Sequence, residues 1–243
     1  MPREQVVIHT EDGDCAATFH TTGAAAPAVI MYVDAVGFRD TFSDMGDHLA
    51  GLGYTVLVPD VYYRTPHEPF DVATVFSVPD ERARLGALAK SLTTPRVIAD
   101  AGAFLTYLAN RPEVAGAAVG TTGYCMGGRL SLLAAAAHPD RVAAAATFHA
   151  GNLANADDPD SPHRAVGTIR GTVHIAAAEN DRSFPQEQYD RLDQSLTEAG
   201  VTHTMSVYPA AHGFAVPDNG TYDQAAADRH WAALSELYGA TLH

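Results

Sequence analysis

The sequence predicts an α/β fold in which helices cover both faces of a mostly parallel, eight-stranded sheet. Short apolar runs of strand length alternate with longer amphipathic stretches along the chain. Strands that alternate with helices in this way pair in parallel through right-handed crossovers. Only a short polar turn separates the first two strands, which predicts a hairpin and an antiparallel edge. We expect residues 1–243 to form a single domain of this type.

The expected strands are rich in Val, Ile, Ala, Thr and aromatic residues, a composition that suits a pleated and largely buried surface. Turn-forming or polar residues follow most of them and end the strand pattern. In chain order the expected strands are residues 5–10, 15–21, 28–34, 55–60, 117–125, 142–150, 172–181 and 203–212.

Helices are expected between these strands, where apolar residues recur at helical spacing. The alanine-rich stretch around residues 132–146 contains no repeat and indicates a helix packed closely on a strand. The expected helices lie at about 39–52, 82–91, 96–110, 126–138, 184–199 and 221–239.

Two longer connections, near residues 61–81 and 152–170, are rich in helix-breaking residues. Each follows the carboxyl end of an expected strand. Open α/β sheets bind ligands at that end, so both connections are candidate pocket walls. The alternative for each is a solvated surface loop.

The composition excludes several classes of function. Twenty-nine acidic residues against 15 basic ones give a formal net charge of −14, which repels nucleic acid and anionic lipid. The first residues lack the apolar stretch of a signal peptide, and no segment is apolar enough to span a membrane. We therefore expect a cytoplasmic protein without nucleic-acid or membrane partners. The two cysteines show no paired spacing, so neither a disulfide framework nor a metal site is expected.

The segment Gly123-Tyr-Cys125-Met-Gly127 lies between an expected strand and an expected helix. This is the form of the nucleophile elbow, and with the order of elements it predicts the α/β-hydrolase fold. A nucleophile at such a turn has a strained backbone, and side chains two residues away on either side would collide. The helix that follows also directs N–H groups at the sulfur, which favours the thiolate.

A cysteine among apolar residues is more often a small buried hydrophobe than a nucleophile. For Cys125 the preceding strand, the following helix and the two glycines favour the catalytic role. Cys15 has none of these features, and we expect it to be a structural residue of the second strand.

A nucleophile of this type needs a base and an acid that orients the base, in the chain order nucleophile, acid, histidine. Asp181 lies at the end of an expected strand and is the candidate acid, with Glu179 as the second choice; the alternative for Asp181 is a helix N-cap or a turn acid before the next helix. His212 follows the last strand and is the candidate base. His149, at the end of the expected strand 142–150, could face the pocket rim and is a candidate substrate contact.

The oxyanion hole is expected to use two backbone N–H groups. One belongs to Met126, directly after the nucleophile, and the other to Ala35, in the loop after the third strand. Asp34 places a carboxylate beside this site and is a further catalytic candidate.

At this point the sequence resembles the dienelactone hydrolase family over essentially its whole length. The resemblance rests on GYCMGG, AHGF, LVPDVYYR, DERARLGAL and the acid before the oxyanion residue. It implies a cofactor-free hydrolase that opens small lactones or activated esters through a thioester intermediate.

The resemblance also implies roles for three residues. A glutamate of the family takes the thiol proton, and Asp34, one methylene shorter, stands at its position. Of the two arginines that hold the substrate carboxylate, one resembles Arg84 and the other is replaced by Val216. The alternative for Arg84 is a charge on a helix surface.

The chemistry of sulfur independently favours the same substrates. A thiolate leaves a tetrahedral intermediate more readily than an ordinary alkoxide, so attack on a simple ester tends to reverse. An enol ester or strained lactone departs as a stabilised enolate. Two other functions stay open: a hydrolase-fold protein that only binds a small molecule or partner, and a redox-sensing thiol protein. The sequence leaves the oligomeric state and the natural substrate open.

Overall fold

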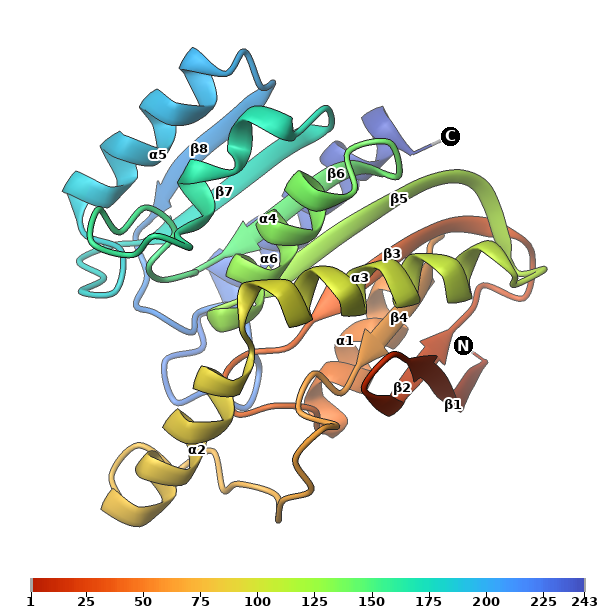
Figure 1. Cartoon of the computed structure of the whole chain (residues 1–243), viewed down its shortest axis with the longest axis horizontal. Coiled ribbons are helices and arrows are strands. Elements are labelled where there is room, and N and C mark those ends of the chain that lie inside the picture. Colours follow the sequence, from red (N-terminus) through yellow and green to blue (C-terminus); the bar gives the residue numbers. More distant parts are fainter. Residues whose placement is uncertain (1, 243) are drawn as a thin grey trace.

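In a computed structural model that describes residues 2–242, eight strands form one sheet in the order β1-β2-β4-β3-β5-β6-β7-β8 (Figure 1). The strands are β1 (Arg3–Thr10), β2 (Gly13–His20), β3 (Ala26–Tyr32), β4 (Thr55–Pro59), β5 (Val114–Tyr124), β6 (Val142–Phe148), β7 (Thr172–Ala178) and β8 (His203–Tyr208). This is the predicted fold class, and every predicted strand is present.

The sheet is antiparallel at one edge and parallel elsewhere. β1 and β2 form the predicted hairpin, with Thr10 opposite Gly13 beside the turn, and β2 also pairs antiparallel with β4. The other five pairings are parallel. The carboxyl ends of β3 to β8 therefore meet at one edge of the sheet.

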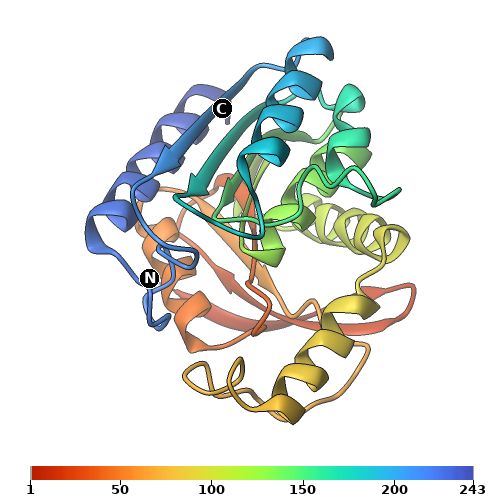
Figure 2. The same cartoon turned by 90° about the vertical axis from the view of Figure 1, so that its left-hand side faces the viewer.

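Residues 2–242 contain six α-helices, and all six were predicted to within a few residues of their ends. They are α1 (Asp40–Gly51), α2 (Pro79–Ser91), α3 (Thr94–Ala109), α4 (Met126–Ala137), α5 (Gln186–Glu198) and α6 (Gln224–Thr241). Figure 2 shows α1 and α6 on one face of the sheet and α3, α4 and α5 on the other. α2 projects beyond the carboxyl edge of the strands (Figure 1).

The loop between β6 and β7 contains two short 3₁₀ helices that the sequence did not predict, Pro162–Arg164 and Val166–Thr168. Pro162 begins the first of them, a position where its missing N–H costs no hydrogen bond. No helix within residues 2–242 has the length and hydrophobicity needed to cross a membrane.

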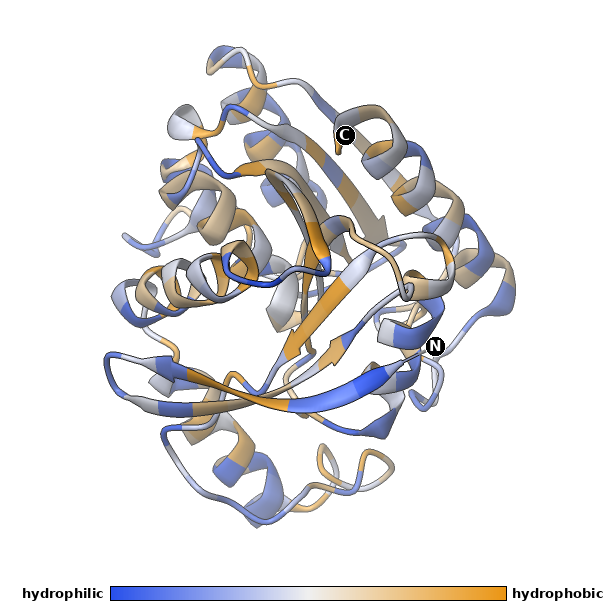
Figure 3. Ribbon diagram, turned by 90° about the vertical axis from the view of Figure 1, so that its right-hand side faces the viewer, coloured by the Kyte–Doolittle hydropathy of each residue, from blue (hydrophilic) through white to orange (hydrophobic). Residues whose placement is uncertain are grey.

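Small residues bring α4 close to the sheet. The alanine-rich β6 is buried almost throughout, and α4 packs on β5 and β6. A Cβ at Gly128 of α4 would lie 2.4 Å from the Cβ of Ala150, so no larger residue fits there. Hydrophobic residues are concentrated on the central strands (Figure 3). This close packing fixes the start of α4 above the ends of β5 and β6.

Candidate active site

Cys125 lies at the sharp turn between β5 and α4. Its backbone has φ 52° and ψ −116°, outside the regions that L-residues normally adopt. A Cβ at Gly123 would lie 1.9 Å from the carbonyl oxygen of Gly127, and a Cβ at Gly127 would lie 2.4 Å from that of Tyr32. Glycine is therefore sterically required on both sides of Cys125, as expected for an elbow. The cysteine is partly exposed at the N-terminus of α4.

His212 and Asp181 lie in the loops that follow β8 and β7, two adjacent parallel strands. His212 Nδ1 donates a hydrogen bond of 2.6 Å to Asp181 Oδ2. Asp181 is buried, with 4% of its side chain exposed, while 34% of the His212 side chain is exposed. The structure thus brings the candidate base and acid together. Glu179, the second choice for the acid, is exposed.

Asp181 is not the N-cap of α5, because Pro185 occupies that position. Its second oxygen, Oδ1, accepts hydrogen bonds from the N–H of Ser183 at 2.8 Å and from Ser183 Oγ at 2.7 Å. Ser183 Oγ also lies 3.5 Å from His212 Nδ1. Sequence reasoning did not single out Ser183; its position two residues after an acid, typical of an Asx turn, was the available signal.

The pKa shifts of the pair show how its charges are held. Burial alone would lower the pKa of His212, but its hydrogen bond to Asp181 and its interaction with the Cys125 sulfur raise it to about 10. Burial would raise the pKa of Asp181, but the hydrogen bonds from His212 and Ser183 lower it. The site therefore favours an imidazolium beside the sulfur and a carboxylate behind it.

The two candidate oxyanion donors lie on either side of the β3–β5 pairing, where Tyr32 stands opposite Gly123. Ala35 follows β3 and Met126 follows Cys125, and both are partly exposed. Within residues 2–242 neither backbone N–H has a hydrogen-bond acceptor. Both donors are thus available to a ligand atom at this edge.

Tyr62 connects the two donor residues, a role that sequence reasoning missed. Its hydroxyl donates to the carbonyl oxygen of Ala35 at 2.9 Å and lies 3.2 Å from the sulfur of Met126. Burial raises the pKa of this hydroxyl, and the nearby carboxylate of Asp34 and the sulfur of Cys125 add to the increase. Tyr62 therefore stays a neutral donor.

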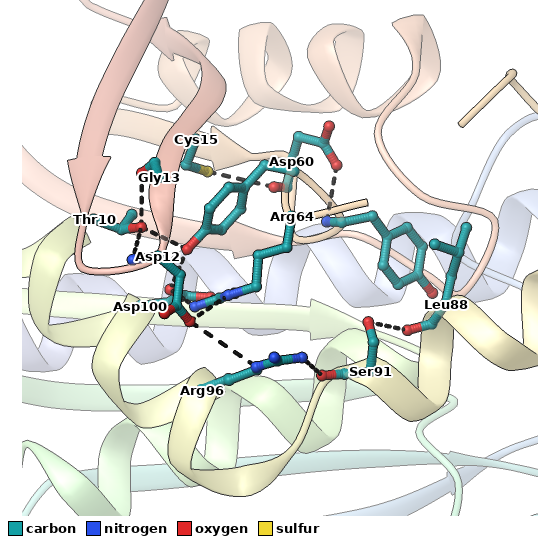
Figure 4. Close-up of polar contacts among 12 residues, drawn as sticks. Thr10, Asp12, Gly13, Cys15, Asp60, Arg64, Leu88, Ser91, Arg96 and Asp100 are labelled. Carbon is teal, nitrogen blue, oxygen red and sulfur yellow. Dashed lines mark hydrogen bonds and ion pairs between the residues drawn. The ribbon is translucent and has the colours of Figure 1, made fainter. Parts of the chain in front are cut away.

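A buried polar cluster holds the segment that carries Tyr62 (Figure 4). Arg64 donates two hydrogen bonds, of 2.7 and 2.8 Å, to the two carboxylate oxygens of Asp100 on α3. Tyr63 donates to the same carboxylate at 2.9 Å, and Arg64 also reaches Asp12 in the β1–β2 turn at 2.7 Å. This cluster explains the final Tyr63-Arg64 of the motif LVPDVYYR as a structural anchor.

Cys15 belongs to the same region and is fully buried on β2. Its thiol donates to the carbonyl oxygen of Asp60 at 3.3 Å (Figure 4). Burial and the nearby carboxylate of Asp60 raise the pKa of this thiol. These surroundings fit a structural cysteine.

Asp34 is buried, and its hydrogen bonds lead away from the cysteine. Arg39 donates to both carboxylate oxygens, at 2.8 and 2.9 Å, and the N–H of Val36 donates to Oδ1 at 3.0 Å. Within residues 2–242 no hydrogen bond joins Asp34 to Cys125 or His212. Arg39 was not among the residues that the sequence predicted for the site.

Arg84 and Val216 stand at the positions of the family's two carboxylate-binding arginines, and each has its contacts within the protein. Arg84 lies on α2, where it pairs with Glu81 at 2.6 Å, donates to the carbonyl oxygen of Glu68 and stacks over Phe70 at 4.1 Å. Val216 is completely buried. The side chain of Val216 offers no surface to a ligand. The two terminal nitrogens of the Arg84 guanidinium are engaged, while its buried Nε has no hydrogen-bond partner within residues 2–242.

His149 lies behind His212 instead of at an open rim. Only 1% of it is exposed, and its backbone has φ 41°. Its ring packs edge-on against the rings of His212, 5.2 Å away, and Phe214, 5.0 Å away. Burial lowers the pKa of His149 well below its ordinary value, and the neighbouring His212 lowers it further. It is thus a neutral ring that supports the candidate base from beneath.

Two adjoining cavities, of about 350 and 530 Å³, border the loops of Asp181 and His212. Asn180, Asp181 and Arg182 line both cavities. The larger one reaches His212, but Cys125, Ala35 and Met126 line neither cavity, so these cavities lie beside the proposed reaction centre and do not enclose it. Residues 2–242 contain no group of three or more His, Cys, Asp or Glu side chains that could hold a metal ion.

Comparison with known proteins gives a consistent result. The model of the dienelactone hydrolase family matches residues 16–242. A mouse protein named "Carboxymethylenebutenolidase homolog" is 30% identical over 193 residues, 78% of this chain and 71% of the mouse protein. A Synechocystis sp. protein named "Putative carboxymethylenebutenolidase" is 26% identical over 223 residues, 87% of this chain and 85% of that protein.

Solved structures of similar fold include a protein named for the same family and a peptidase. The crystal structure of a "Putative Dienelactone Hydrolase" from Klebsiella pneumoniae matches with a TM-score of 0.84 and 23% identity, over 98% of each chain. An acylaminoacyl peptidase of Pyrococcus horikoshii matches with a TM-score of 0.70 and 13% identity, over 99% of this chain and 42% of that one. At these identities the matches show the fold alone, and they confirm the predicted α/β-hydrolase fold.

Proposed function

We propose that this chain, which belongs to the dienelactone hydrolase family and is a carboxylic ester hydrolase, uses Cys125 as its nucleophile. Its proposed substrates are small lactones or enol esters. The observation that carries the proposal is the 2.6 Å hydrogen bond between His212 and a buried Asp181, at the edge where the strained turn presents Cys125. A base, an orienting acid and a nucleophile are the parts that acyl transfer requires.

In the proposed acylation step, the thiolate of Cys125 attacks the carbonyl carbon of the substrate. The carbonyl oxygen becomes an oxyanion, which the N–H groups of Ala35 and Met126 stabilise. Collapse of the tetrahedral intermediate breaks the bond to the leaving oxygen, and the leaving enolate can take the proton of the His212 imidazolium. The product is a thioester on Cys125.

In the proposed deacylation step, neutral His212 takes a proton from water as the water oxygen attacks the thioester carbonyl. The same N–H groups hold the second oxyanion. When this intermediate collapses, the carbon–sulfur bond breaks, the carboxylic acid product leaves, and the thiolate of Cys125 returns beside the imidazolium. Asp181 stays ionised throughout and keeps the ring of His212 in orientation.

The charge state of the pair supports the choice of substrate. Burial would lower the pKa of His212, but Asp181 and Cys125 raise it to about 10, which favours an imidazolium beside the sulfur. A stable thiolate is a good leaving group, so it competes with any poor leaving group of the substrate. Enol esters and enol lactones release a stabilised enolate, so they are the carboxylic esters that suit such a nucleophile.

Substitution of the nucleophile tests the proposal. Cys125→Ala should abolish hydrolysis of an enol ester and an enol lactone while thermal unfolding stays unchanged. Mass spectrometry of the wild-type protein, quenched during turnover of a slow enol ester, should show the acyl group on Cys125. Unchanged hydrolysis by Cys125→Ala would reject the cysteine as nucleophile.

Two further measurements, alkylation by iodoacetamide and treatment with peroxide, separate the two other functions that the sequence left open. If no ester or lactone is hydrolysed and iodoacetamide fails to alkylate Cys125, the chain is a binding protein on this fold. If peroxide changes the binding of a partner but hydrolysis does not depend on Cys125, the cysteine is a redox sensor. The complete burial of Cys15 argues against a resolving partner for Cys125 within residues 2–242.

A further inference from the structure

Two loops of the candidate site come from distant parts of the chain and meet at one arginine. The first, residues 34–38, carries the oxyanion donor Ala35 and is called here the oxyanion loop. The second, residues 212–218, begins with the candidate base and is called here the histidine loop. Arg39 lies at the end of the first loop and is separated by 179 positions from Asp218 at the end of the second.

Arg39 pairs with one carboxylate from each loop. It donates two hydrogen bonds to Asp34, at 2.8 and 2.9 Å, and two to Asp218, at 2.7 and 2.9 Å. A fifth bond, of 3.0 Å, reaches the carbonyl oxygen of Gly37. Every N–H direction of the guanidinium fork is thus directed to one of the two loops, an arrangement that a lysine cannot reproduce.

On the oxyanion loop, this pairing holds the peptide group next to the donor. Asp34 accepts the N–H of Val36 at 3.0 Å, and the carbonyl oxygen of the same peptide, that of Ala35, accepts the hydroxyl of Tyr62 at 2.9 Å. The peptide is therefore held at both ends. Because the N–H of Ala35 is on the adjacent peptide, its direction depends on this hold.

On the histidine loop, Asp218 also accepts the hydroxyl of Thr41 at 2.7 Å. The loop behind it is internally bonded, since the N–H of Asn219 donates to the carbonyl oxygen of Val216 at 3.0 Å, and that of Val216 donates to Gly213 at 3.2 Å. A displacement of Asp218 would therefore shift the hydrogen-bonded turns that lead back to His212.

The burial of these charges makes the pairing strong. Side-chain exposure is 15% for Arg39, 6% for Asp34 and 31% for Asp218. Charge-assisted hydrogen bonds in such surroundings are about twice as strong as neutral ones, and removal of one partner leaves an uncompensated charge. The pairing with Asp34 also occupies both oxygens of the carboxylate that the family resemblance would make a proton acceptor.

We infer that Arg39 is a positioning residue that fastens the oxyanion loop to the histidine loop, and that Asp34 serves this fastening instead of accepting the thiol proton of Cys125. The inference rests on the proposed function, because it concerns the placement of the Ala35 donor relative to His212. Arg39 acts through the two loops and contacts no reacting atom.

The central test substitutes the arginine and separates the oxyanion hole from the thiol. Arg39→Gln should lower kcat for an enol ester about 100-fold, the usual cost of a misplaced oxyanion donor, with a much smaller change in KM. Alkylation of Cys125 by iodoacetamide needs no oxyanion hole, so its rate should change far less than kcat does. Arg39→Lys, which keeps the charge but loses the fork, should have intermediate kcat.

Asp34→Asn distinguishes the two roles of the carboxylate. If Asp34 only holds the loop, this variant should lower kcat in the same way as Arg39→Gln and leave the pH profile of alkylation unchanged. A shifted alkylation profile in Asp34→Asn would overturn the inference, because it would mean that the carboxylate exchanges a proton with Cys125.

Arg111 offers a matched control. It also lies between two carboxylates from different segments, Glu4 and Glu113, at 2.6 and 3.1 Å, and it stacks on Phe19 at 4.5 Å. Glu113 directly precedes β5, at the end of that strand opposite to Cys125. Arg111→Gln should cost less stability in urea unfolding, because Glu4 and Glu113 are 50% and 34% exposed, and it should leave kcat unchanged. An equal loss of kcat in Arg39→Gln and Arg111→Gln would overturn the inference, since it would reflect general destabilisation.

Hydrogen exchange measures the fastening without any substrate. In Arg39→Gln, amides of both the oxyanion loop and the histidine loop should exchange faster, while those around residues 111–113 should not. This result would stand even if Cys125→Ala retained activity and the proposed nucleophile failed. Unchanged exchange in both loops, or unchanged kcat in an otherwise active protein, would show that Arg39 fastens nothing.

Discussion

At the residue scale, the charges of the site depend on a few side chains behind the reacting atoms. Asp181 is held by His212 on one oxygen and by Ser183 on the other. His149 packs against His212 from beneath with no hydrogen-bond partner for either ring nitrogen within residues 2–242. Such buried, unpaired polar atoms are uncommon, and here they leave His149 a neutral packing surface beside an imidazolium.

Removal of the orienting acid should be costly. Asp181→Asn keeps the shape but removes the charge that stabilises the imidazolium, so we expect kcat to fall about 1,000-fold or more. Steady-state kinetics on an enol ester would measure this change. Ser183→Ala removes only one bond to Asp181 and should lower kcat about ten-fold at most. A larger effect of Ser183→Ala than of Asp181→Asn would contradict these assignments.

The raised pKa of His212 predicts how the stability of the fold depends on pH. Its folded pKa of about 10, raised by Asp181 and Cys125 despite burial, exceeds the ordinary value of 6.5. The folded state therefore binds the proton more tightly, and this contribution to stability is complete below pH 6.5 and lost as the pH rises through 10. In urea unfolding, the stability difference between wild type and His212→Asn should shrink over that range. A stability difference between wild type and His212→Asn that grows with pH would contradict the predicted direction of this dependence.

At the element scale, the turn from β5 to α4 determines where the sulfur lies. The strain at Cys125 is maintained because glycines let the strand end, the helix start and β3 approach one another. The helix start also supplies the N–H of Met126. One piece of backbone therefore presents the nucleophile and one of the two oxyanion donors.

Gly123→Ala should disrupt this element. The added Cβ would lie 1.9 Å from the carbonyl oxygen of Gly127, a clash with backbone that no side-chain movement relieves. We expect a loss of stability of about 3 kcal/mol or more, or a failure to fold, measured by urea unfolding. Gly86→Ala is the control, because nothing lies within 4 Å of its Cβ on α2. It should stabilise the protein by up to about 1 kcal/mol. Equal effects of the two variants would contradict the steric argument.

At the scale of the whole molecule, the sheet and α6 enclose histidines that fold in their neutral form. His230 is completely buried, its ring accepts or donates a 2.8 Å bond with the hydroxyl of Tyr124, and burial lowers its pKa to about 3. Burial also lowers the pKa of His174 on β7 to about 4. The unfolded chain binds protons at these positions at a higher pH than the folded chain does, so acid favours unfolding.

Stability should therefore fall as the pH drops from 6.5 toward 3. For His230 alone the loss at pH 4 is roughly 3 kcal/mol, from its shift in pKa. His230→Leu should be less stable than wild type near neutral pH but should show a shallower decline in acid. Urea unfolding across this pH range would measure both slopes, with His9→Gln, at a side chain 85% exposed, as the control. A parallel decline in wild type and His230→Leu would show that His230 does not contribute.

The sequence alone determined the fold class, the eight strands and the six helices, because alternating apolar runs and helical periodicity are local properties of the chain. It also indicated the elbow around Cys125, since the glycines that the turn requires stand within two residues of the nucleophile. The sequence also indicated Asp181 and His212 as candidates, because each comes at the end of an expected strand and they follow Cys125 in the expected chain order. The hydrogen bond between their side chains is visible only in the folded structure.

Only the tertiary structure decided what surrounds those residues. Tyr62 meets Ala35, Arg39 joins Asp34 to Asp218, and Val216 is buried, because strands and loops far apart in the chain end at one edge of the sheet. Sequence patterns carry the spacing of neighbours along a strand or helix. They do not indicate with which distant carboxylate a guanidinium will pair, because that depends on how the packed layers bring the loops together.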